Sequence, residues 1–117
     1  MKVFALLALA LTLALTACRS SHIDITVQNQ TGAPVRLLEV DYPYASFGID
    51  TLAPGATFHY RISVQGNGPV KVQYTAPDRR QPQIKGPELV EKQEGALEIL
   101  LLPAGKAEFR PLPTPNH

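Results

Sequence analysis

The sequence predicts a small antiparallel β-sandwich of about seven strands, with a small β-barrel as the alternative. Apolar and polar residues alternate with a period of two in several segments, as in half-buried strands. Proline and glycine recur every several residues, and no segment carries an apolar stripe of helical period over three turns. The 117 residues suffice for one domain.

The alternation places the expected strands at residues 23–28, 35–42, 47–50, 56–65, 70–74, 83–85 and 96–102. In the first strand, alternate apolar residues starting at Ile23 share one face. The second strand changes phase at Leu37-Leu38, which predicts a β-bulge. The third strand is short, and the Pro54-Gly55 pair that follows it fits the centre of a type II turn.

The fourth strand has the clearest alternation, with Phe58, Tyr60, Ile62 and Val64 expected to face the core. Residues 66–69 are expected to close a hairpin to the fifth strand. The sixth strand lies in a polar, proline-rich stretch. The last strand is apolar in both phases, which predicts burial on both faces.

The sandwich domain is therefore expected to cover residues 23–102. Residues 103–117 hold four prolines, and we expect an extended or disordered C-terminal tail.

The first residues predict an export signal rather than part of the fold. Lys2 precedes an Ala/Leu-rich run from Val3 to Leu15 with one polar break. A spanning helix needs about 20 apolar residues, and no stop-transfer pattern follows. The run therefore fits the apolar region of a signal peptide.

The run ends at Leu15-Thr16-Ala17-Cys18, which resembles the lipobox of bacterial lipoproteins. The resemblance implies cleavage between Ala17 and Cys18, a signal peptide over residues 1–17 and acyl chains on Cys18. Residues 18–22 would then form a short lipidated tether. Arg19 after the cysteine implies release to the outer membrane, facing the periplasm, if the source has two membranes. The alternative is an ordinary signal peptide that is cut elsewhere.

Charge and cysteine content narrow the function classes. Residues 1–17 carry Lys2 and no acidic residue, so ten basic and ten acidic side chains remain after cleavage. This balance, without a basic block, argues against a nucleic-acid partner. Cys18 is the one cysteine of the chain, so no disulfide within the chain is expected.

No motif in the sequence points to catalysis, a metal or a cofactor. The three histidines lack metal-ligand spacing, and His59 is expected to point outward beside Arg61. Neither a nucleophile elbow nor a phosphate-binding loop is present. We therefore expect a protein that is not an enzyme and that needs no metal or cofactor.

Two groups of residues are candidate contact sites. Tyr42, Tyr44 and Phe47 gather three aromatic rings around a proline, and aromatic loops are common contact surfaces. The alternative is that Tyr42 and Phe47 cap the core and that Tyr44 alone is exposed. A second group, Arg79, Arg80 and Lys85, could contact lipid headgroups or an anionic glycan; the alternative is a solvated loop.

Residues 23–102 are weakly similar, in pattern, to the immunoglobulin-like sandwiches of exported bacterial proteins, although a paired cysteine and a tryptophan are lacking. This similarity implies a fold and no function. We expect a lipid-anchored envelope protein with an accessory, structural or protein-binding role near the membrane surface. Another envelope protein is the expected partner, besides the membrane itself. The alternative is a carrier or sensor of a small ligand, which predicts an apolar cavity of a few hundred Å³.

Overall fold

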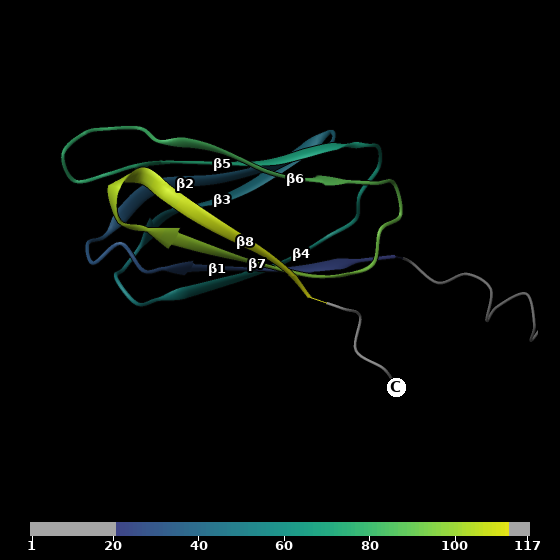
Figure 1. Ribbon diagram of the computed structural model, residues 1–117, viewed down its shortest axis with the longest axis horizontal. Coiled ribbons are helices and arrows are strands. Elements are labelled where there is room, and N and C mark those ends of the chain that lie inside the picture. The colour runs from purple at the N-terminus through teal and green to yellow at the C-terminus, as the bar shows by residue number, and fades with distance from the viewer. Residues whose placement is uncertain (1–20, 113–117) are drawn as a thin grey trace, which may run out of the picture.

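A computed structural model describes residues 21–112 and places them in two four-stranded sheets without an α-helix in that range (Figure 1). The elements in chain order are β1 (Ile23–Asn29), β2 (Val35–Tyr42), β3 (Ala45–Leu52), β4 (Thr57–Ile62), β5 (Gly68–Thr75), β6 (Gln83–Leu89), β7 (Gly95–Leu102), η1 (Pro103–Gly105) and β8 (Lys106–Leu112). The predicted β-sandwich is confirmed. The alternative barrel does not form, because the two sheets are not joined by strand pairing.

The strand order is β4-β1-β7-β8 in one sheet and β3-β2-β5-β6 in the other. The pairs are antiparallel, with one exception: β1 and β7 run parallel. The expectation of an antiparallel sandwich is therefore wrong for the β1–β7 pair and correct for the other pairs. Residues distant in sequence make the parallel pair, and local alternation carries no information about it.

The core lies between the two sheets and is built from alternate strand residues. Ile25 and Val27 of β1 and Ile99 and Leu101 of β7 are buried side by side. Val40 and Val72 face them from the other sheet. The predicted burial of β7 on both faces holds in part: Leu100, which points away from the core, is also buried, whereas Leu102 on the same face is partly exposed.

The edge between β3 and β4 is filled by aromatic rings. The rings of Phe47 and Tyr60 stack with centroids 4.5 Å apart, and Phe58 lies 6.0 Å from Phe47. Because β4 is an edge strand, Tyr60 remains 45% exposed, and the expected burial of that face is only partial.

The predicted bulge in β2 is present. Pairing with β5 shifts register between Arg36 and Glu39, and Leu37 takes a φ of 51°. Leu37 is consequently turned out to solvent.

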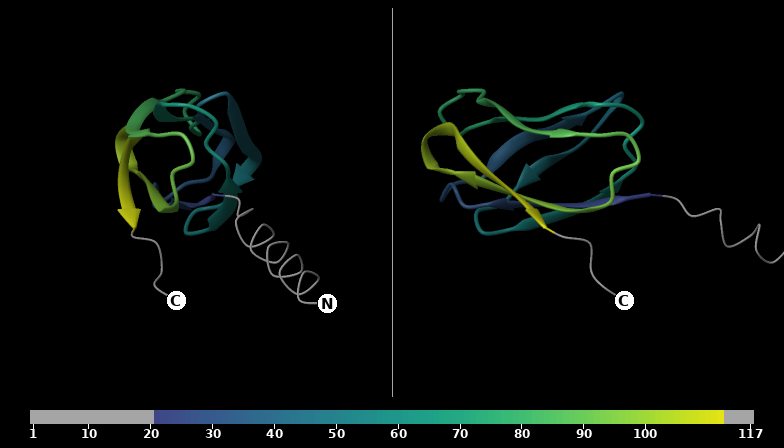
Figure 2. Two further views of the ribbon diagram at one scale, coloured as in Figure 1. Left: turned by 90° about the vertical axis from the view of Figure 1, so that its right-hand side faces the viewer. Right: turned by 45° about the vertical axis from the view of Figure 1, so that its right-hand side comes forward.

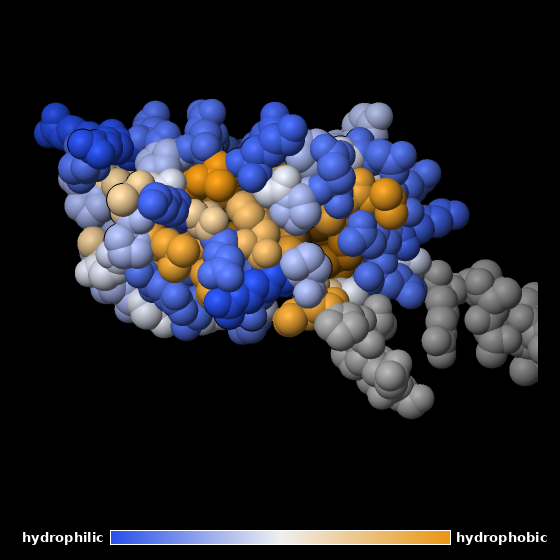
Figure 3. Space-filling view, in the orientation of Figure 1, coloured by the Kyte–Doolittle hydropathy of each residue, from blue (hydrophilic) through white to orange (hydrophobic). Residues whose placement is uncertain are grey.

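The expected C-terminal tail is wrong for residues 103–112. The chain turns at η1 and returns as β8 along β7, so the sandwich domain extends to Leu112 rather than ending at 102. Pro111 is tolerated because β8 is an edge strand, and the Phe109 ring packs over Gly86 of β6. Figure 3 shows a broken band of apolar side chains across the face that carries β6 and β8. Residues 113–117 lie outside the described residues.

The two ends of the sandwich differ in what they carry. The proximal end is where β1 begins, and it holds the loops 43–44, 63–67 and 90–94. The distal end holds the loops 30–34, 53–56, 76–82 and 103–105. Figure 2 shows the chain entering at the proximal end.

Candidate functional site

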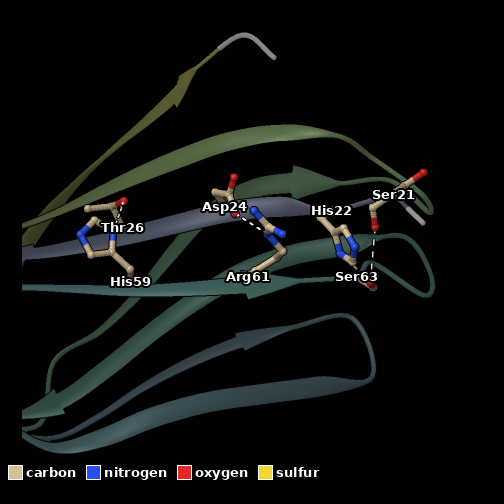
Figure 4. A network of polar contacts seen from close by, with 7 residues as sticks. All are labelled: Ser21, His22, Asp24, Thr26, His59, Arg61 and Ser63. Atoms are coloured by element: carbon tan, nitrogen blue, oxygen red, sulfur yellow. Dashed lines mark hydrogen bonds and ion pairs between the residues drawn. The ribbon is translucent and has the colours of Figure 1, made fainter. Parts of the chain in front are cut away.

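Ser21, the first residue that the structure describes, is hydrogen-bonded to the fold. The Ser63 hydroxyl donates to the Ser21 carbonyl oxygen at 3.3 Å and lies 3.3 Å from Nδ1 of His22 (Figure 4). The Gly95 amide donates to the His22 carbonyl oxygen at 3.3 Å. The segment at the start of β1 therefore belongs to the rigid domain.

The outer face of β1 and β4 carries a ladder of polar pairs (Figure 4). Arg61 donates to Asp24 at 2.9 Å, and the hydrogen bond raises the pKa of Arg61. Thr26 Oγ1 lies 3.2 Å from Nδ1 of His59. His59 thus points outward beside Arg61, as predicted, and exposed pairs of this kind contribute little to stability.

The three aromatic candidates do not form one surface. Phe47 is buried and belongs to the core, which corrects its assignment as a contact residue. Tyr42 is half-buried and packs on Phe47 with centroids 6.2 Å apart. Tyr44 is 87% exposed. The alternative interpretation therefore holds: Tyr42 and Phe47 pack against the core, and of the three Tyr44 alone is exposed.

Tyr44 occupies a constrained position at the tip of the β2–β3 hairpin. It follows Pro43 in a two-residue connection and has a φ of 67°, the position of a type II turn that usually takes glycine. Its ring lies against Gly66, where a β-carbon would overlap it. The ring is thereby held at the proximal end.

The basic candidates are also separated. Arg79 and Arg80 lie in the β5–β6 connection at the distal end, and Arg80 pairs with Asp78 at 3.2 Å. Lys85 lies on β6 opposite Lys71. The three residues therefore form no single anion site, and the arginines lie at the opposite end of the sandwich from Ser21.

An open cleft of about 600 Å³ lies at the distal end between the two sheets. Its lining includes Val35, Tyr74, Pro82 and Pro103, with Arg80 and Asp78 at its side. Burial, followed by the charge of Asp78, raises the pKa of Tyr74. The sequence did not predict the position of this cleft, because residues from three separate connections line it. The prolines at the ends of the neighbouring strands were the one local indication that irregular segments meet there.

Across residues 21–112, no group of three His, Cys, Asp or Glu side chains converges to hold a metal ion. No helix in the described part of the chain is long and apolar enough to cross a membrane.

Asp41 on β2 provides a test of the local electrostatics. Burial raises its pKa, Glu39 raises it further, and Lys71 opposes the shift. A carboxyl whose pKa is raised by folding destabilises the fold above that pKa, and the penalty fades as the pH falls through it. We expect Asp41→Asn to raise Tm slightly at pH 7, on the order of 1–2 °C, and to change it less at pH 3. Thermal unfolding followed by circular dichroism measures both; a lower Tm at pH 7 would contradict this account.

Comparisons with known proteins place the fold. No family model matches the sequence, and no curated protein matches it. A solved structure with a similar fold is the NMR structure of a protein from Eubacterium rectale, with a TM-score of 0.56 and 16% identity. The match covers 82% of this chain and 92% of that one. At this identity the likeness concerns the fold alone.

Proposed function

We propose that this protein is a lipid-anchored, non-enzymatic protein of a bacterial cell envelope, which holds its β-sandwich at the membrane surface for an accessory, structural or protein-binding role. The observation that carries the proposal is Leu15-Thr16-Ala17-Cys18 directly after the apolar run. Two or three acyl chains on one cysteine suffice for stable anchoring, because each buried methylene contributes about 0.8 kcal/mol. In a source with two membranes, Arg19 favours the outer one.

The contacts of Ser21 support a position close to the lipid. Only Arg19 and Ser20 separate Cys18 from Ser21, the first residue that the structure describes, whose carbonyl oxygen is bound by Ser63. Three residue steps span at most about 10 Å. An anchored sandwich would therefore present its proximal end to the membrane.

The anchor is tested by expressing the full chain in a bacterial host. We expect it in the membrane fraction, with mass spectrometry showing an acylated cysteine as the first residue. Cys18→Ala should abolish both, while Ser20→Ala serves as a matched control and should change neither. An unmodified soluble protein, or a Cys18→Ala variant that is still membrane-bound, would refute the proposal.

The distal cleft favours a second candidate function, the binding of a small ligand. Its volume lies within the range of ligand sites, and apolar side chains and the Arg80–Asp78 pair both line it. Native mass spectrometry of the protein released from its own envelope should show a bound molecule. Ala33→Phe, which fills the cleft, should remove it, whereas Ala53→Phe on the same end but outside the cleft should not. The candidate is rejected if the released protein carries nothing.

A further inference from the structure

Three of the five large hydrophobic side chains exposed in residues 21–112 lie at the proximal end. The five large hydrophobic residues exposed in the described chain are Leu37, Tyr44, Tyr60, Val90 and Leu112. Tyr44 is the tip of a hairpin there, Val90 begins the 90–94 loop, and Leu112 ends β8. The most exposed of them, Tyr44, has no partner strand or helix above it within residues 21–112, and its conformation costs backbone strain.

Tyr44 is also physically connected to the start of the chain. Its ring lies on Gly66, in the 63–67 loop. Ser63, at the start of that loop, donates to the carbonyl oxygen of Ser21. The ring and the point where the chain enters the fold therefore share one short, ordered loop.

Charge divides the proximal end into two parts. The loops 43–44 and 63–67 contain no charged residue, whereas the 90–94 loop contains Glu91, Lys92 and Glu94. Moving the charged side chains of the 90–94 loop out of water and into the bilayer costs desolvation free energy, whereas the neutral part has no such penalty. The neutral part is the one that holds Tyr44.

We propose that the Pro43-Tyr44 turn and its 63–67 platform rest in the headgroup region of the bilayer, with the Tyr44 ring as the inserted group. This inference rests on the proposed lipid anchor. Tyrosine suits the membrane interface because it joins an apolar ring to a polar hydroxyl. A single ring binds weakly alone, but the anchor makes its contact with the bilayer an intramolecular event at high effective concentration. The contact would fix the orientation of the sandwich and leave the distal cleft facing away from the lipid.

The chain has no tryptophan, so Tyr44→Trp introduces a single fluorescent probe at the site. The acylated full protein is reconstituted in phosphatidylcholine vesicles, with and without lipids brominated near the headgroup. We expect the fluorescence emission of the Tyr44→Trp variant to lie at shorter wavelength in vesicles than in detergent-free buffer without lipid. The brominated lipid should quench this emission. The matched control is Leu37→Trp, also exposed and also at positive φ, but on the β2 bulge near the distal end; its emission should be unchanged.

The outcomes separate this inference from the proposed anchor. If mass spectrometry shows acylated Cys18 and the protein floats with the vesicles, but Tyr44→Trp is not quenched, the lipid contact is wrong and the anchor stands. That result would leave an envelope protein as the occupant of the turn. If Cys18 carries no acyl chain, the anchor itself is wrong. Equal quenching of the Tyr44→Trp and Leu37→Trp variants would also overturn the inference, because the sandwich would then have no fixed orientation.

Discussion

Replacing Asn29 with aspartate is expected to lower the free energy of unfolding by about 3–5 kcal/mol, the usual cost of an uncompensated buried charge. Asn29 is fully buried at the end of β1. Its Nδ2 donates to the carbonyl oxygens of Ala33 at 2.8 Å and Leu52 at 2.9 Å. Its Oδ1 accepts from the Thr31 amide at 3.0 Å and the Thr31 hydroxyl at 2.7 Å. An aspartate would turn a carboxylate oxygen toward two carbonyl oxygens.

Urea denaturation followed by circular dichroism measures this loss. Asn67→Asp is the matched control, since Asn67 lies in a loop and its Oδ1 accepts an exposed hydrogen bond from the Glu91 amide, which aspartate keeps. It should change stability by less than about 0.5 kcal/mol. In the Asn29→Asp variant, folding should favour the protonated form of the new carboxyl, so the deficit should shrink as the pH falls. Equal stability of the two variants at pH 7 would contradict the role assigned to Asn29.

The fold class was predictable because local alternation reports directly which face of a strand is buried. Ile25 and Val27 alternate with polar residues, and both apolar side chains are buried in the structure. The change of phase at Leu37 predicted a bulge for the same reason, since an inserted residue reverses the alternation. These signals lie within single strands and need no knowledge of the partner.

The remaining features depend on contacts between distant residues. The parallel pairing of β1 with β7 joins segments at opposite ends of the domain sequence, beyond any local pattern. Strand β8 was missed because the four prolines of residues 103–117 indicated a tail. An edge strand such as β8 nevertheless tolerates Pro111. The sequence left Phe47 open as a contact residue or as a cap of the core, because its stacking on Tyr60 of the facing sheet joins residues distant in sequence. Of the three aromatic candidates, Tyr44 remains a contact candidate. The sequence interpretation allowed for its exposure, but nothing in the sequence indicated that its ring lies against Gly66.

Gly48→Ala is expected to destabilise the fold by about 1–3 kcal/mol, the usual cost of overpacking. Gly48 lies on β3 opposite Glu39, next to the β2 bulge. A β-carbon at this position would overlap the carbonyl oxygen of Leu38, which belongs to the backbone and has no alternative rotamer. Because this carbonyl oxygen can move only if the backbone of β2 moves, position 48 takes glycine without strain and no larger residue.

Gly68→Ala is the matched control for Gly48→Ala, because it lies in the same sheet and its β-carbon would make an ordinary contact of 3.4 Å with Pro43. Urea denaturation should show a clear loss for Gly48→Ala and a change below about 0.5 kcal/mol for Gly68→Ala. Equal losses for Gly48→Ala and Gly68→Ala would show that the overlap with the Leu38 carbonyl oxygen is not the cause.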